Sequence, residues 1–306
     1  MAAEPDILPG PRTSPEMHLP PAKPLGTTLS DRRPSTWISE VSLGIPASLW
    51  AHRIIVWRLV SREIAARYRG SIFGFAWALL SPIALLTIYT FVFTVVFQAR
   101  WHADVSNRGD FALNLFIGLI IFQFFSECML RASNLLLENV AFIKKVVFPL
   151  ECLAWVAVGT AGFGALMNLA VLFAAHLLLA GLPPPTLVLF PLIAIPLILM
   201  TVGLIWFLAA TGVYLRDLGQ IVGVIMPMLL FSSAVFFPLA AIPVPYRDWL
   251  GLNPLVQIIE MSRGLLLSGT VPSVVAFLLI TALAAVIAWL GLAWFRATRR
   301  GFADIV

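Results

Sequence analysis

The chain has 306 residues, of which 60% are hydrophobic and 11% are charged, and its mean hydropathy is +0.95. Soluble domains carry roughly 45–50% apolar and about 25% charged residues, since much of any folded surface must face water. The composition excludes a soluble enzyme and a disordered chain, and it predicts an all-α integral membrane protein. The net charge of +5 does not indicate nucleic-acid binding, because the basic residues lie at the ends of apolar segments.

The first 46 residues differ from the rest of the chain. Eight of the first 34 are proline, and no apolar periodicity runs through them. Such a segment cannot bury enough apolar surface to offset its chain entropy, so residues 1–46 are predicted to be a disordered cytoplasmic tail. The tail lacks the apolar core of a signal peptide, so the first membrane segment is expected to direct insertion.

Residues 47–69 are predicted to form an amphipathic helix that lies in the membrane interface. Large apolar side chains recur at spacings of three, four and seven residues, and arginines are interspersed among them. Tryptophans on one stripe and arginines elsewhere are typical of an interfacial helix. A helix packed on a partner protein is the alternative, and both can hold at once. The residues expected to carry this role are Trp50, Arg53, Trp57, Arg58 and Arg62.

Six apolar segments follow within the membrane domain, residues 70–306, each long enough to cross about 30 Å of hydrocarbon. Twelve basic residues flank the spans on the side of the amino terminus and four on the other side, which places both termini in the cytoplasm. Internal prolines are expected to kink two of the spans, at Pro82 and Pro227, and the fourth carries prolines near its start. The predicted spans are Ile72–Gln98, Phe111–Leu130, Leu150–Ala180, Thr186–Leu215, Ile221–Leu239 and Val271–Phe295.

Two connections between spans are predicted to be helical. In residues 133–148, polar positions interrupt an apolar run, which indicates a short amphipathic helix that ends before Pro149. Its apolar side chains suit a groove on a cytoplasmic partner, and a connector resting on the lipid surface is the alternative. Residues 240–269 are apolar but broken by prolines, Glu260 and Arg263, so they predict a pair of short helices at the outer leaflet.

The sequence has no recognisable catalytic motif. It contains no GxxxxGKS/T loop, no GxGxxG and no HExxH, and its four histidines are scattered. Cys128 and Cys152 lie in or beside apolar runs without metal-binding spacing and are interpreted as buried hydrophobic residues. We therefore expect no enzyme activity, metal or cofactor in this chain. Glu127 and Arg131 are predicted to pair along the second span, with a functional gate as the alternative.

Aromatic residues concentrate toward the outer side of the membrane. Tyr89, Phe93, Phe97 and Trp101 step by four and so share one helix face, and a second group follows the fifth span. Sugar rings present apolar C–H faces that can lie on aromatic rings, so these residues suit a channel for a sugar polymer. An aromatic belt at the membrane interface is the alternative. The candidate channel-lining residues are Tyr89, Phe93, Phe97, Phe231, Phe236, Phe237 and Trp249.

Four groups of short motifs occur in order along the chain. They are Arg67-Tyr68-Arg69-Gly70-Ser71 leading to Ser81-Pro82, Lys144-Lys145 before Phe148-Pro149, Tyr214-Leu215-Arg216-Asp217-Leu218, and Asn253-Pro254. Their order and placement on six spans resemble the permease subunits of polysaccharide-exporting ABC transporters, the type-2 exporter class that moves O-antigen, teichoic acid and capsule polymers. The resemblance covers about residues 48–306 and is greatest to the O-antigen subgroup.

This resemblance implies a homodimeric, multi-pass permease of the bacterial inner membrane. It implies ATP-driven export of a polysaccharide on a polyprenyl-diphosphate carrier, with two copies of a cytoplasmic ATPase binding ATP and Mg. Arg67 and Arg69 are then candidate diphosphate contacts, although topology explains their charge equally well. Other readings are an ABC exporter of a lipid or drug, an ion channel and a membrane-embedded transferase. The residues implied in coupling to the ATPase are Glu138, Asn139, Phe142, Ile143, Lys144 and Lys145.

Overall fold

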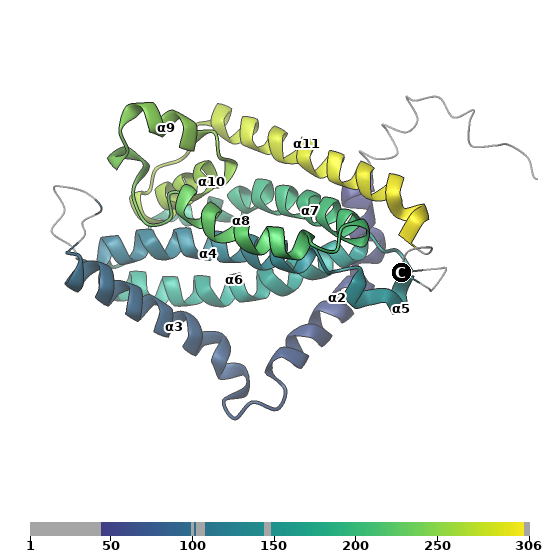
Figure 1. The fold of residues 1–306 in the computed structure, drawn as a ribbon. Helices are drawn as coiled ribbons and strands as arrows, with labels where there is room; N and C mark the ends of the chain where they lie inside the picture. Colours follow the sequence, from purple (N-terminus) through teal and green to yellow (C-terminus); the bar gives the residue numbers. More distant parts are fainter. Residues whose placement is uncertain (1–43, 99–100, 102–107, 144–147, 303–306) are drawn as a thin grey trace, which may run out of the picture. The chain divides into compact units, whose positions relative to one another are not determined.

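The computed structural model describes residues 44–98, 101, 108–143 and 148–302 (Figure 1). Every regular element in this part of the chain is a helix, which confirms the predicted all-α class. The predicted tail lies almost wholly outside the described residues. The α-helices are α2 (Gly44–Tyr68), α3 (Trp77–Thr90), α4 (Arg108–Ala132), α5 (Val140–Ile143), α6 (Cys152–Leu179), α7 (Phe190–Tyr214), α8 (Leu218–Ser232), α9 (Val244–Gly251), α10 (Pro254–Arg263) and α11 (Val274–Thr298).

Within the described part of the chain, five helical segments are long and apolar enough to cross a membrane. Each matches a predicted span to within a few residues, because a continuous apolar run of sufficient length is the dominant signal for a membrane helix. The first span joins a 3-10 turn, η2 (Gly74–Ala76), α3 and a π-helical segment, η3 (Phe91–Val96). The five spans are Gly74–Val96, Gly109–Ala132, Cys152–Leu179, Pro185–Tyr214 and Val274–Thr298.

The remaining apolar helix, α8, is shorter than the span predicted at Ile221–Leu239. It has 15 residues and so reaches about 22 Å, less than the ~30 Å of a hydrocarbon core. The helix stops because Ala234 adopts a left-handed backbone with φ of 52°, and the hydroxyl of Ser233 donates to the Leu229 carbonyl at 2.6 Å. The sixth crossing therefore stays a prediction.

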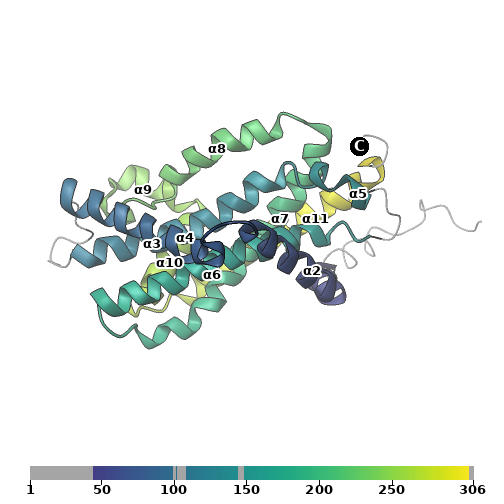
Figure 2. The same ribbon diagram turned by 90° about the horizontal axis from the view of Figure 1, so that it is seen from below.

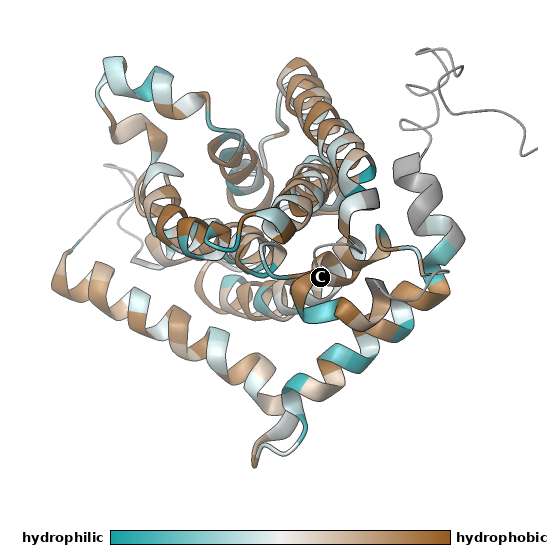
Figure 3. Ribbon diagram, turned by 45° about the vertical axis from the view of Figure 1, so that its right-hand side comes forward, coloured by the Kyte–Doolittle hydropathy of each residue, from teal (hydrophilic) through white to brown (hydrophobic). Residues whose placement is uncertain are grey.

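The α4 helix lies at the centre of the packing. Its side chains from Phe111 to Phe122 are all buried, and α6, α7, α8 and α10 contact it. By contrast α3 buries few side chains and exposes leucine, isoleucine and phenylalanine along its length. Figure 2 shows α8 running along one edge of the bundle. In Figure 3, hydrophobic colouring predominates along the long helices, and the exposed apolar side chains of α3 suit a surface that faces lipid or another apolar partner.

The helix bundle has two ends, which we call the α2 end and the α9 end after the helices that lie there. At the α2 end, the start of α6 is held to the end of α11 by the Glu151 carboxylate, 3.2 Å from Nη1 of Arg299. At the α9 end, two short helices, α9 and α10, precede a π-helical segment, η7 (Gly264–Ser268). Two short helices were predicted for residues 240–269, and their location at the outer leaflet stays a prediction.

Glycine allows α7 and α11 to approach until their backbones touch. A Cβ atom placed on Gly291 would lie 2.0 Å from the carbonyl oxygen of Gly203, and one placed on Gly203 would lie 2.5 Å from the Cα of Ala288. Small residues at helix crossings let membrane helices pack closely by van der Waals contact. The Tyr214 hydroxyl also donates to the Thr298 carbonyl at 3.0 Å, so the two helices are joined at the α2 end as well.

Replacing Gly291 by alanine is expected to destabilise the protein, because the added methyl group meets backbone that cannot rotate away. We expect a loss of about 1–3 kcal/mol, typical of an overpacked core, and a lower melting temperature of the purified protein in detergent. The matched control is Gly162→Ala on α6, where a Cβ meets nothing within 4 Å. That change is expected to be neutral or slightly stabilising. Equal melting temperatures for the two variants would contradict the close contact.

Candidate functional site

The α2 helix packs on α6 through a face that the sequence analysis did not single out. Val56 and Val60 are buried, and Val60 fits over Gly159, where a Cβ would come within 2.7 Å of its Cγ2. Trp50 and Trp57, 72% and 71% exposed, point away from this contact. The helix bounds agree with the predicted segment, while the interfacial role of the tryptophan stripe stays a prediction.

The arginines predicted to serve the interface also lie on the exposed part of α2. Arg53, Arg58 and Arg62 are exposed. The Arg53 guanidinium lies 4.9 Å from the centre of the Trp50 ring and donates to the Trp50 carbonyl at 2.9 Å. This cation–π contact presents an amphipathic pair, one apolar ring and one charge, which suits a boundary between lipid and water.

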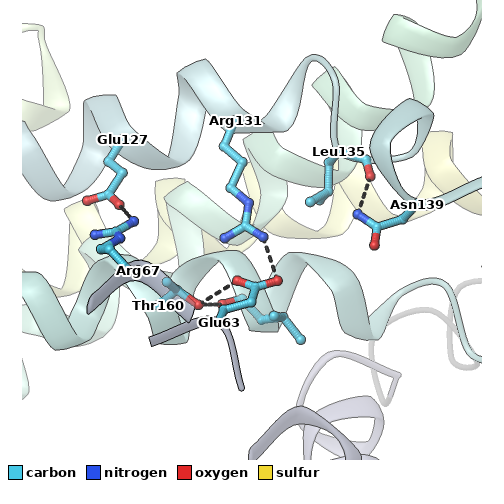
Figure 4. Close-up of polar contacts among 8 residues, drawn as sticks. Glu63, Arg67, Glu127, Arg131, Leu135, Asn139 and Thr160 are labelled. Atoms are coloured by element: carbon cyan, nitrogen blue, oxygen red, sulfur yellow. Dashed lines mark hydrogen bonds and ion pairs between the residues drawn. The ribbon is translucent and has the colours of Figure 1, made fainter. Parts of the chain in front are cut away.

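Two ion pairs fasten α2 to α4 (Figure 4). Arg131 donates to the Glu63 carboxylate at 2.7 Å, and Arg67 pairs with Glu127. The hydroxyl of Thr160 on α6 donates to the second Glu63 oxygen at 2.9 Å, so three helices meet at this carboxylate. The described part of α2 is therefore held by charge as well as by apolar packing.

The prediction that Glu127 pairs with Arg131 within α4 was wrong, because each of these residues pairs with a residue of α2 instead. Both helices carry an acid four residues before a base, and the pairs show that they run in opposite directions. In that arrangement each acid faces a base on the other helix. Glu63 was not considered from the sequence, although its spacing of three and four from Val60 and Arg67 places it on the same helix face.

A pocket of about 720 Å³ opens beside these ion pairs, within the usual range for ligand sites. Its charged residues come from the end of α2, the end of α4 and the following 3-10 turn, η4 (Leu137–Asn139). Its apolar residues come from α3, the middle of α4 and α8. The lining residues are Arg67, Tyr89, Leu119, Phe122, Gln123, Ser126, Glu127, Leu130, Arg131, Glu138 and Leu230.

Aromatic rings continue from this pocket toward the α9 end. Tyr89 lines the pocket and lies 6.4 Å from the ring of Phe236, which stacks on Phe93 at 5.9 Å. Phe93 belongs to the π-helical segment η3, a type of turn often found at functional sites. We define the aromatic cluster by its ring contacts, which join Tyr89, Phe93, Phe97, Trp101, Phe111, Phe231 and Phe236.

Five of the seven predicted channel-lining residues thus come together in the structure. Phe111 was not among them, because it stands at the start of α4 rather than in the two aromatic-rich segments. Phe237 is half-buried outside the cluster, and Trp249 is 75% exposed on α9. Whether the cluster faces a channel stays a prediction.

A buried arginine fixes the chain that carries Phe236. Arg263, only 4% exposed, donates to the carbonyls of Asn114, Ala234 and Val235 at 2.9–3.0 Å. These bonds hold the turn after α8 against α4. A Cβ on Gly118 would lie 2.9 Å from the guanidinium, so this glycine makes room for it.

The charge of Arg263 is balanced by two neighbours. Its Nη1 lies 2.8 Å from the Glu260 carboxylate, and its guanidinium stacks 4.4 Å from the Trp101 ring. Burial lowers the pKa of Arg263 to about 10, opposed by Glu260, so the group stays charged at neutral pH. Sequence analysis treated Arg263 only as an interruption, although a single arginine in an apolar segment is itself a signal.

The predicted coupling residues are only partly described. Glu138 lines the pocket, and the Asn139 side chain donates to the Leu135 carbonyl at 2.9 Å. The Phe142 ring stacks on Phe148 at 4.4 Å, which ties the short helix α5 to the start of α6. The side chains of Ile143, Lys144 and Lys145 lie outside the described residues.

Of the two candidate diphosphate contacts, one is already paired. Arg67 binds Glu127, whereas Arg69 is exposed in the turn after α2. Cys128 and Cys152 are buried, as predicted. Among the described residues, no three histidine, cysteine or acidic side chains gather closely enough to hold a metal ion.

Comparison with known proteins places this arrangement among membrane transporters. The model of the ABC-2 type transporter family matches residues 55–267, from α2 to η7. The chain is 27% identical over 260 residues to the O-antigen export system permease protein RfbA of Myxococcus xanthus, covering 84% of this chain and 97% of that one. It is 26% identical over 251 residues to the RfbA protein of Klebsiella pneumoniae, covering 81% and 93%. It is also 27% identical over 249 residues to the polysialic acid transport protein KpsM of Escherichia coli, covering 80% and 93%.

The two ion pairs are expected to differ in strength. Glu63 and Arg131 are each about 25% exposed, whereas Arg67 and Glu127 are 44% and 37% exposed. Double-mutant cycles with glutamine, followed by thermal melting, are expected to give a coupling energy of about 1 kcal/mol for the first pair and a few tenths for the second. A zero coupling for Glu63 and Arg131 would show that they do not hold α2.

Proposed function

The chain belongs to the ABC-2 type transporter family and is a multi-pass inner-membrane protein, and from this premise we propose that it is the permease of an ATP-driven polysaccharide exporter. Two copies form the conduit, and the cargo is a polymer such as O-antigen on a polyprenyl-diphosphate carrier. The observation that carries the proposal is the continuity of the pocket with the aromatic cluster between α3, α4 and α8.

The order of side chains along this path suits a sugar polymer. Polar groups at the α2 end, including Gln123 and Ser126, can exchange hydrogen bonds with sugar hydroxyls. Farther along, Tyr89 and the exposed rings of Phe97 and Phe231 offer apolar faces on which successive sugars can lie. Stacking on an aromatic ring does not require one particular sugar. A long polymer can therefore pass without any of its sugar units being held tightly.

The exposure of α3 and α8 supports a two-fold assembly. Both helices line the pocket and both expose apolar side chains, including Phe91 on η3 and Val224 and Met228 on α8. A single chain supplies one wall of a path, and a second copy facing it would close the other. Dimers with a two-fold axis are the commonest assemblies of identical chains.

The energy for export comes from a separate ATPase in this proposal. The printed sequence holds no phosphate-binding loop, and moving a lipid-linked polymer across a bilayer requires a drive. With the α2 end in the cytoplasm, α2 and the connector 133–148 face the ATPase, and Arg69 stands near the carrier diphosphate. The two ion pairs then transmit a displacement of α2 to α4, which forms one wall of the pocket.

Replacing Tyr89 and Phe236 together by alanine tests the conduit. We expect at least about ten-fold less surface polysaccharide at unchanged protein level, since each aromatic contact contributes about 0.5–1.5 kcal/mol. The assay is a polysaccharide gel or antibody blot of the source bacterium, with the chromosomal copy replaced. The matched control is Phe207→Ala on α7, whose ring lies against Trp294 away from the pocket. Unchanged surface polysaccharide after deletion of the whole gene would refute the proposed function.

Replacing Phe142 and Ile143 by alanine tests the coupling. Loss of the Phe142–Phe148 stack is expected to lower polymer display while the permease stays folded, because the connector no longer moves with α6.

Tagged wild-type protein from native membranes is expected to bring down an ATP-binding chain in equal amount. Normal display by the double variant would argue against the connector, and repeated recovery of the wild type alone would argue against an ABC exporter.

A further inference from the structure

The pocket is balanced in charge among the residues that line it. Two arginines, Arg67 and Arg131, stand against two carboxylates, Glu127 and Glu138. Each arginine is already paired with a carboxylate. The partner of Arg131 is Glu63, which is not one of the residues that line the pocket. The lining therefore presents no uncompensated positive charge to a passing ligand.

A polyanion would meet repulsion in such a pocket. An acidic sugar drawn toward Arg67 comes equally close to Glu127, and two like charges at such a short separation repel each other. Binding the acid by displacing Glu127 would leave that carboxylate unpaired at the pocket wall. A neutral sugar meets neither cost.

Beyond the charged end, the described segments that carry the aromatic rings have no acidic or basic side chain of their own, and the neighbouring Arg263 is already paired with Glu260. Residues 77–98 of the first span, 111–126 of α4 and 218–239 around α8 contain no aspartate, glutamate, lysine or arginine. The hydroxyls of Thr90 and Thr94 are bound to carbonyls of their own helix at 2.6 Å. A charged repeat would pass here without a compensating partner, and burial of an unpaired charge is costly.

We propose that the exported polymer is built of uncharged sugars, and that Glu63 and Glu127 determine this specificity by neutralising Arg131 and Arg67. The inference rests on the proposed function and adds the substrate class. The negative charge of the cargo is then confined to the carrier end. The two carboxylates act as positioning residues for the arginines and also as a filter against acidic polymers.

Binding of two probes with one backbone tests this inference. Full-length protein in phosphatidylcholine nanodiscs is titrated with end-labelled dextran and with dextran sulfate of equal chain length, at low salt, and fluorescence anisotropy gives each Kd. Low ionic strength strengthens any charge preference. The wild type is expected to bind dextran at least as tightly as dextran sulfate.

Removing one carboxylate should reverse the preference. Glu127→Gln frees Arg67 and Glu63→Gln frees Arg131, and each is expected to tighten dextran sulfate binding about ten-fold with little change for dextran. The double variant Arg67→Gln with Glu127→Gln removes the pair as a unit and is expected to show no gain. Glu151→Gln is the matched control, because it makes the same change in net charge outside the pocket.

The outcomes separate the two proposals. Tighter binding of dextran sulfate by the wild type, or an equal gain in the Glu151 variant, overturns the charge filter but leaves a carbohydrate-binding permease. A gain that persists in the Arg67 and Glu127 double variant also overturns it. Binding of neither probe counts against the pocket as a carbohydrate site and removes the inference with it, while the gene-deletion assay judges the export function separately.

Discussion

The burial of α4 is the constraint on which the rest of the structure depends. A helix covered on all sides can be apolar around almost its whole circumference, and from Phe111 to Phe122 the only polar side chain of α4 is that of Asn114. Its polar groups are consequently concentrated near its ends, where each has a defined partner. Glu127 and Arg131 bind α2 at one end, and the Asn114 carbonyl accepts from Arg263 near the other. The pocket, the aromatic cluster and the turn after α8 are all positioned against this one helix.

The sequence predicted the long helices well, because their signal is local. An apolar run such as residues 271–295 has one outcome in a membrane, and the structure places α11 there within a few residues. The end of α8 was not predicted, since it depends on a left-handed Ala234 whose conformation is held by Arg263 from another element. Local propensity gives no warning of such a turn, because alanine normally favours the helix.

The contacts between elements were the other part that the sequence did not predict. Glu127 and Arg131 carry the spacing of an intrahelical pair, and spacing alone favoured that reading. Only the presence of α2, running in the opposite direction with the same acid–base order, redirects both side chains. The grouping of Tyr89, Phe93 and Phe97 was predictable because they share a helix face. Phe111 joins them only through the packing of η3 on α4.

The glycine contact between α7 and α11 has a mechanical consequence. Two helices whose backbones touch at Gly203 and Gly291, and whose ends are joined by Tyr214 and Thr298, can shift only as one rigid body. The residues that line the pocket come from α2, α3, α4, η4 and α8, and none of them belongs to the α7–α11 pair. In the proposed exporter, a change in the shape of the pocket therefore requires movement of helices other than α7 and α11, for which the joined pair is a fixed reference.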